Sequence, residues 1–100
     1  MGSSEYLGRT RTHPEFTMVS LGAFPQIHRG GIQAVKGELY RVTRDTLRRL
    51  DRFEGVPHLY RRELVTLACG KEAWLFLRDE ARGQQVVPAG DWRAWVASRD

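Results

Sequence analysis

The fold is decided by residues 43–57, which read TRDTLRRLDRFEGVP and predict one short helix with both ends marked. Thr43 is a favourable N-cap, and Asp45 lies in the first turn, where the helix dipole favours an anion. Gly55 can adopt the left-handed conformation that ends many helices, and Pro57 cannot continue one. These signals predict a helix that begins after Thr43 and ends at Gly55.

This helix carries a carboxylate on its apolar side. At about 100° per residue, Leu47, Leu50 and Glu54 fall on one stripe. Burial there raises the pKa of a carboxyl group, and the negative end of the helix dipole acts in the same direction. A carboxylate whose pKa is raised towards neutrality suits a general base. Periodicity leaves a second interpretation open, in which the helix frays and Glu54 pairs with Arg61 or Arg62 at the surface.

The composition is that of one ordinary globular domain. The sequence has 100 residues, of which 41% are hydrophobic and 28% charged, as in folded soluble proteins. It contains no apolar run of about 20 residues and no pattern of a signal peptide at its start. Cys69 is the only cysteine, which excludes an internal disulfide and suits a reducing compartment. We therefore expect a single domain over residues 1–100 in the cytoplasm, without membrane association.

The net charge of +4 raises the question of nucleic-acid binding. Nucleic-acid modules usually gather their cations on one face with aromatic residues between them. Here the cations are spread along the chain and include Arg9, Arg11, Arg29, Arg41, Arg48, Arg49, Arg61, Arg62, Arg78 and Arg93. This spread argues against a nucleic-acid partner, and a basic nucleic-acid-binding barrel is kept as the second alternative.

Short strands joined by turns account for the rest of the chain. Turns containing Gly or Pro are expected at 22–25, 30–31 and 70–71, and strands at 7–21, 32–42, 60–68 and 73–78. A short extended piece is expected at 86–88 and a final helical turn at 90–98. Too few crossover helices are present for a parallel sheet. The pattern predicts an α+β fold, a small mixed β-barrel with flanking short helices.

Other kinds of catalytic centre find no support in the sequence. His13, His28 and His58 do not have the spacing of metal ligands, and one cysteine cannot supply a zinc site. Cys69 also lacks a patterned histidine partner, so it is interpreted as structural. The residues therefore predict no metal site, and Glu54 is the strongest chemical signal that remains.

Four motifs stand in an order that matches a known family. They are LGAFP at 21–25, VKGELY at 35–40, LDRFEG at 50–55 followed by LYRR at 59–62, and GDW at 90–92. Together they resemble the gamma-glutamylcyclotransferase-like family, also called AIG2-like, over residues 7–92. The resemblance implies a small β-barrel flanked by helices. It also implies a small-molecule gamma-glutamyl substrate, which is cleaved to 5-oxoproline and a free amine without a metal or organic cofactor.

The resemblance assigns roles to individual residues. The family's catalytic glutamate lies in the Leu-Asp-x-x-Glu-Gly stretch, which here is Glu54. It takes a proton from the substrate's α-amino group, the amine attacks the γ-carbonyl, and the glutamate returns a proton to the leaving amine. Tyr60 and Arg62 match the family's Tyr-x-Arg, and together with Phe24 and Tyr40 they are the candidate substrate-binding residues. Each of these four also has a purely structural interpretation.

The sequence departs from the family at its start. Members begin with a Tyr-Gly-Ser/Thr-Leu strand and loop, whose backbone amides hold the polar end of the substrate. No such stretch occurs here, so we expect a domain truncated at its N-terminus, with its activity in doubt. A missing strand would expose a barrel edge through which a homodimer could form. The first alternative is therefore a non-catalytic domain of the same fold that binds a small ligand or a protein.

Overall fold

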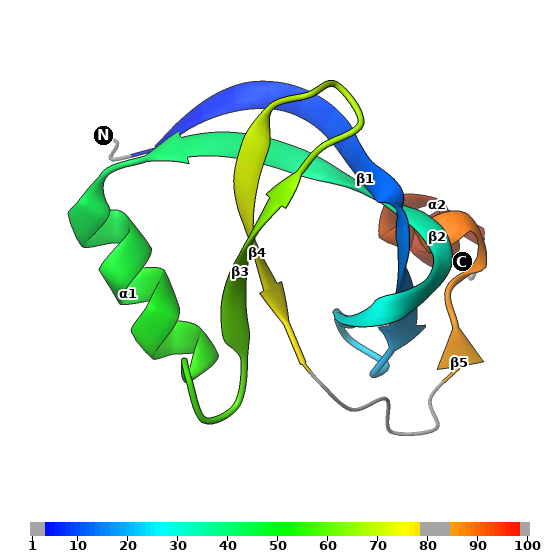
Figure 1. The fold of residues 1–100 in the computed structure, drawn as a ribbon. Coiled ribbons are helices and arrows are strands. Elements are labelled where there is room, and N and C mark those ends of the chain that lie inside the picture. The colour runs from blue at the N-terminus through cyan, green and yellow to red at the C-terminus, as the bar shows by residue number, and fades with distance from the viewer. Residues whose placement is uncertain (1–3, 79–84, 99–100) are drawn as a thin grey trace.

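Two long antiparallel strands form the frame of the molecule (Figure 1). The computed structural model describes residues 4–78 and 85–98. Strand β1 (Ser4–Ser20) pairs with β2 (Pro25–Val42) from Ser4 opposite Val42 to Ser20 opposite Pro25. The predicted turn at 22–25 joins them, and its Leu21 N–H donates to the Phe24 carbonyl over 3.0 Å. The ribbon arches over the rest of the chain.

The predicted boundaries of β2 were wrong at its N-terminal end. The strand starts at Pro25 and runs through the two glycines that were expected to form a separate turn. Phe16 of β1 pairs with both Arg29 and Gln33, so the residues between these two bulge out of the ladder. Gly30 and Gly31 have φ values of 95° and 117°, which glycine adopts without strain. The expected turn is therefore a bulge within one strand.

A two-stranded hairpin forms a second sheet. It consists of β3 (Arg61–Thr66) and β4 (Glu72–Leu77), joined by the predicted turn around Gly70. A bridge between Thr12 and Leu67 fastens its tip to β1. At the other end the Arg78 N–H donates to the Ile27 carbonyl over 3.0 Å. The hairpin therefore crosses the β1–β2 ribbon and is tied to it at both ends (Figure 1).

The core lies between the ribbon and the hairpin. Alternate residues of the strands point into it, as expected for β4, where Leu77 is buried and Trp74 is exposed. Its buried members are Phe16, Met18, Val35, Val65, Leu67, Leu77 and Val87. The C-terminal part closes one side through β5 (Gln85–Val86), η1 (Pro88–Gly90) and α2 (Trp92–Ser98). Trp92 and Trp95 of α2 pack against the core.

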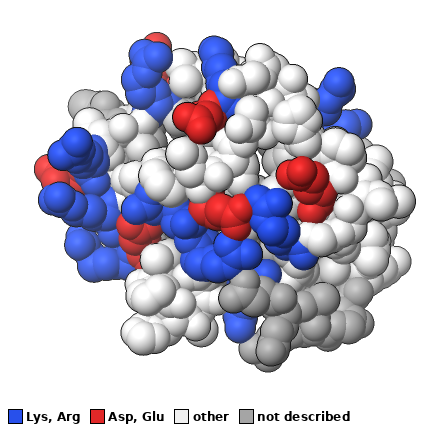
Figure 2. All heavy atoms as spheres, in the orientation of Figure 1, with Lys and Arg blue, Asp and Glu red and all other residues white. Residues whose placement is uncertain are grey.

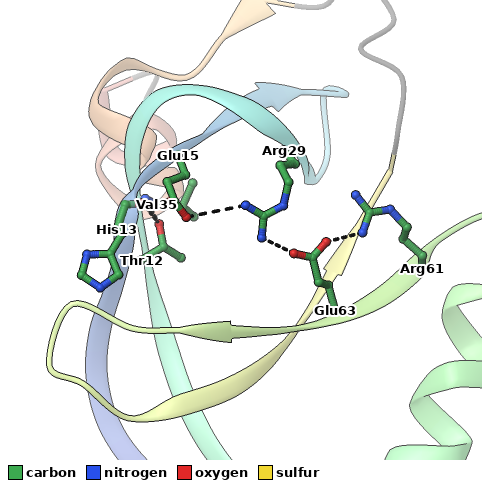
Figure 3. Close-up of polar contacts among 7 residues, drawn as sticks. All are labelled: Thr12, His13, Glu15, Arg29, Val35, Arg61 and Glu63. Atoms are coloured by element: carbon green, nitrogen blue, oxygen red, sulfur yellow. Dashed lines mark hydrogen bonds and ion pairs between the residues drawn. The ribbon is translucent and has the colours of Figure 1, made fainter.

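One polar side chain is satisfied inside this core. The Thr12 hydroxyl accepts a hydrogen bond from the Val35 N–H over 2.9 Å and donates to the His13 carbonyl over 2.8 Å (Figure 3). Thr12 thereby fills a gap in the ladder where the β1–β2 register shifts.

Helix α1 (Arg44–Glu54) has the predicted limits. The Thr43 hydroxyl accepts from the Thr46 N–H over 3.1 Å, and Gly55 is left-handed, with φ 70°. The N-cap and the stop signal are both confirmed. The helix lies beside the two sheets, at the edge of the molecule (Figure 1).

The predicted α+β class with flanking short helices is confirmed. Among the described strands, the pairings give the sheets β2-β1-β5 and β3-β4, and no continuous ladder closes them into a barrel. Neither α1 nor α2, nor any other helix in the described ranges, is long and apolar enough to cross a membrane.

Replacing Gly55 by Ala should destabilise the protein. A Cβ at Gly55 would meet Leu59 Cδ1 at 2.9 Å, and φ is positive there. Strain in the left-handed region alone costs about 1–2 kcal/mol. We expect the free energy of unfolding in urea to fall by at least about 1 kcal/mol. Gly37→Ala is the matched control, because its added Cβ meets nothing within 4 Å. Equal effects of the two substitutions would contradict the prediction.

Candidate functional site

The catalytic candidate Glu54 occupies the last position of α1 and is half-buried. Leu47 and Asp51 are half-buried as well, whereas Leu50 is 37% exposed. The prediction that Leu50 helps to define the inward face was therefore wrong. The stripe facing the sheets runs through Leu47, Asp51 and Glu54, at spacings of four and three residues. Glu54 lies on this face, as predicted.

An ion pair explains the rotation of the helix. Arg62 of β3 donates two hydrogen bonds to the Asp51 carboxylate. The bond from Nε to Oδ1 is 2.7 Å long, and the bond from a terminal nitrogen to Oδ2 is 3.1 Å long. The Arg62 guanidinium also lies over the Trp74 ring, 4.2 Å from its centroid. A two-pronged pair of this kind fixes orientation as well as distance. The Asp51–Arg62 pair turns the Asp51 side of the helix towards β3 and leaves Leu50 exposed at the edge of that side.

Glu54 has no cationic partner in the part of the chain that the structure describes. Arg62 is engaged by Asp51, and Arg61 pairs with Glu63. Within residues 4–78 and 85–98, the Glu54 carboxylate makes no hydrogen bond or ion pair. Burial, uncompensated by any neighbouring charge, raises the pKa of Glu54 above its ordinary value. Of the two interpretations that the sequence left open, the structure favours the inward carboxylate.

The segment after Glu54 folds back against the helix. The Val56 N–H donates to the Asp51 carbonyl over 2.9 Å, and the Leu59 N–H donates to the Gly55 carbonyl over 2.7 Å. This turn leads to Tyr60, which directly precedes β3. Arg62, two residues further on, contacts Asp51 of the helix that carries Glu54.

The other two candidate binding residues lie elsewhere. Tyr40 is 48% exposed near the end of β2, and its ring contacts that of Tyr6 at a centroid distance of 5.4 Å. Phe24 is 53% exposed in the turn between β1 and β2. The strand register places Phe24 and Tyr40 at opposite ends of the ribbon. The structure does not bring these two residues together.

A charged cluster between the sheets was not predicted. Arg29 of β2 and Arg61 of β3 both contact the Glu63 carboxylate, and Glu15 lies 3.6 Å from Arg29 (Figure 3). The hydrogen bond from Arg29 is the largest of the effects that lower the pKa of Glu63. Figure 2 shows basic side chains gathered over α1, with acidic and basic ones alternating across the middle of this face.

An open pocket of about 710 Å³ lies between the two sheets. Its walls are mainly apolar and include Met18, Ile27, Val65 and Leu75. Charged residues, among them Lys36, stand at its rim, and Glu54 is not among the lining residues. No group of three or more metal-ligating side chains occurs within the described part of the chain.

Comparisons with known proteins agree on one family. The family model described as "Gamma-glutamyl cyclotransferase, AIG2-like" matches residues 1–94. A "Putative gamma-glutamylcyclotransferase" of Vibrio cholerae is 39% identical over 90 residues, covering 89% of this chain and 76% of that protein. A protein of the same designation from Methanocaldococcus jannaschii is 34% identical over 96 residues, covering 91% and 78%.

Solved structures share the fold. The solution structure of protein ytfP from Escherichia coli has a TM-score of 0.74 and 29% identity, covering 93% of this chain and 80% of that one. The crystal structure of an uncharacterized protein from Pyrococcus horikoshii has a TM-score of 0.78 over 96% of this chain and 77% of that one. Its identity of 20% makes it evidence for the fold alone.

Glu54→Gln should stabilise the protein at neutral pH. Because the pKa of Glu54 is raised on folding, the folded state binds more protons than the unfolded state just above the ordinary pKa. The wild type therefore loses stability as pH rises through the folded pKa, and glutamine avoids this loss. We expect a gain of about 0.5 kcal/mol in urea unfolding at about pH 7 that disappears near pH 3.

Asp45→Asn is the matched control for this experiment. Asp45 lies in the first turn of α1, where the dipole favours its charge, so neutralising it should cost about 0.3–1 kcal/mol at about pH 7. Effects of the same sign for the two substitutions would contradict the assigned environment of Glu54.

Asp51 and Arg62 should be energetically coupled. The two side chains are 20% and 22% exposed, so each left alone is a half-buried charge without its partner. A double-mutant cycle of Asp51→Asn and Arg62→Gln, measured by urea unfolding, should give a coupling free energy of about 1 kcal/mol or more. A coupling below about 0.5 kcal/mol would show that the pair does not fasten the helix.

Proposed function

Because the chain belongs to the gamma-glutamyl cyclotransferase, AIG2-like family, we propose that it cleaves a gamma-glutamyl amide by attack of the substrate's own α-amine, with Glu54 as the base. The products are 5-oxoproline and a free amine. The observation that carries the proposal is the position of Glu54 at the end of a capped helix, where its half-buried carboxylate has no partner among the described residues.

The proposed reaction moves protons between two nitrogens of one substrate. Glu54 takes a proton from the α-ammonium group, and the neutral amine attacks the γ-carbonyl carbon. The bond from that carbon to the leaving nitrogen breaks as the lactam ring closes. Glu54 passes to the leaving nitrogen the protons that the α-nitrogen loses, so the amine departs protonated and no water is consumed. One carboxylate thus serves as base and then as acid.

The environment of Glu54 supports this role. A carboxylate paired with an arginine would have a lowered pKa and would be a poor proton acceptor near neutral pH. Asp51 and Glu63 take up Arg62 and Arg61 and so keep these cations away from Glu54. Burial without a cation raises the pKa of Glu54 towards the range in which it can both accept and return a proton.

The four candidate binding residues receive separate roles. Tyr60 lies closest along the chain to the turn that follows Glu54, and we propose that it forms a wall for the substrate. Arg62 is already held by Asp51, so its proposed role is to orient the helix rather than to contact substrate. For Phe24 and Tyr40, which are exposed on opposite ends of the ribbon, the proposal is substrate contact at the periphery.

A second candidate function is supported by the open pocket. Its apolar walls and charged rim are typical of a site for a small amphipathic ligand, and Glu54 does not line it. A non-catalytic binding domain of the same fold would use this pocket. The two candidates differ in whether 5-oxoproline is formed.

Release of 5-oxoproline from a panel of gamma-glutamyl amines should depend on Glu54. We expect Glu54→Gln to lower kcat by about 10²–10⁴-fold, because the amide cannot accept the proton. In the wild type, kcat/KM should fall as pH drops below the raised pKa of Glu54, with an inflection above the ordinary value of a glutamate.

Asp45→Asn provides the control. It removes an exposed carboxylate from the first turn of the same helix and leaves both Glu54 and the Asp51–Arg62 pair in place, so turnover should persist in the folded variant. Full activity of Glu54→Gln would refute the assigned base. Absence of turnover in the wild type, together with ligand binding in the open pocket, would favour the binding domain.

A further inference from the structure

Arg78 carries a half-buried cation that the proposed mechanism leaves unused. It directly follows β4, and its guanidinium lies 5.6 Å from the centroid of the Tyr60 ring. Among the residues that the structure describes, no carboxylate forms an ion pair with it. A ring face attracts a cation but cannot replace the hydrogen bonds that its five N–H groups make in water.

The neighbouring arginines, unlike Arg78, each pair with a carboxylate. Arg29 and Arg61 share the Glu63 carboxylate (Figure 3). Arg62 is held by Asp51. A partly desolvated cation is costly unless an anion or hydrogen-bond acceptors compensate it. Because Arg78 alone of this group lacks a carboxylate in the described structure, it is free to receive an anion from outside the chain.

The backbone of Arg78 is held from both sides. Its N–H donates to the Ile27 carbonyl over 3.0 Å, and its carbonyl lies 3.0 Å from His28 Nδ1. A carbonyl only accepts, so Nδ1 is the donor. His28 is 4% exposed and sits on β2, a strand of the main frame. This fixed backbone sets the point from which the Arg78 side chain extends, and the contact with the Tyr60 ring restricts where its guanidinium lies.

Arg78 and Glu54 lie at the same end of the molecule. The turn after Glu54 folds back on α1 through the Leu59-to-Gly55 hydrogen bond of 2.7 Å and delivers Tyr60 to the start of β3. Arg78 stacks on that tyrosine from the end of β4. In Figure 1 the end of α1, the start of β3 and the end of β4 all lie at the lower side of the view.

We propose that Arg78, positioned by His28 and stacked on Tyr60, binds a carboxylate of the gamma-glutamyl substrate. This inference rests on the proposed function. The planar guanidinium can hold a carboxylate with two parallel hydrogen bonds, for which lysine is a poor substitute. Two carboxylates have this chemistry: the α-carboxylate, present in every gamma-glutamyl compound, and one on the leaving amine when that amine is an amino acid or a peptide.

Paired substrates distinguish the two sources. We would measure kcat/KM for gamma-glutamylalanine and its neutral analogue gamma-glutamylalaninamide with the wild type, Arg78→Gln and Arg48→Gln. Arg48 is the control, an exposed arginine on α1 far along the helix from Glu54. Loss of a charged hydrogen-bonded pair predicts a 10–100-fold drop, about the value of such contacts, for Arg78→Gln. Arg48→Gln should behave as the wild type.

Each outcome has one meaning. A drop confined to gamma-glutamylalanine assigns Arg78 to the leaving amine, and an equal drop on both substrates assigns it to the α-carboxylate. Unchanged kcat/KM of Arg78→Gln on both substrates overturns the proposal. Arg78→Lys, which keeps the charge but loses the fork, should fall below the wild type. An Arg78→Lys variant equal to the wild type would overturn the two-pronged contact.

A binding measurement separates this inference from the proposed function. Calorimetry with gamma-glutamylalanine on Glu54→Gln should show a Kd that rises about 10–100-fold when Arg78→Gln is added. A wild type that releases no 5-oxoproline but shows this rise would overturn the proposed function and support the carboxylate site. Turnover by the wild type, with a Kd unaffected by Arg78→Gln, would overturn the carboxylate site alone. Unfolding midpoints confirm that each variant is folded.

Discussion

The two-pronged pair between Asp51 and Arg62 sets the orientation of the helix on which the candidate chemistry depends. Helix α1 has 11 residues, and none of them is buried. Helices of this length are marginal in water without tertiary contacts. The pair supplies a directional contact to β3, and Trp74 holds the arginine from the other side. Glu54 is one turn beyond Asp51, so the same contact that fastens the helix also faces Glu54 towards the sheets.

The sequence predicted those structural features that depend on residues close together in the chain. The caps of α1, the glycine turn of the β3–β4 hairpin and the inward face of β4 were all found, because each depends on residues close together in the chain. The bulge at Gly30 and Gly31 was missed, since it arises from the pairing of Phe16 with two residues of β2. The burial of Leu50 was wrongly predicted for a similar reason. Helical periodicity takes no account of the ion pair between Asp51 and Arg62, 11 positions away, which orients the helix.

The candidate site was predictable only in its central residue. Glu54 stood out through spacing and desolvation, whereas the roles of Tyr60, Arg62, Phe24 and Tyr40 came from the family resemblance. The contact of Arg29 with Glu63 joins residues 34 apart, and no pattern in the sequence marks it. Arg78 was listed among the scattered cations, because whether an arginine finds a carboxylate is decided by the fold.

Two charged groups near one end of the molecule have no partner of opposite charge among the described residues. Glu54 pairs with no described cation and Arg78 with no described carboxylate, although the arginines and acids around them are paired. The turn that carries Tyr60 lies between them along the chain and places its ring against Arg78. A gamma-glutamyl amide of an amino acid bears one ammonium and two carboxylates. In the proposed function its ammonium meets Glu54 and one of its carboxylates meets Arg78, so a single molecule would compensate both charges.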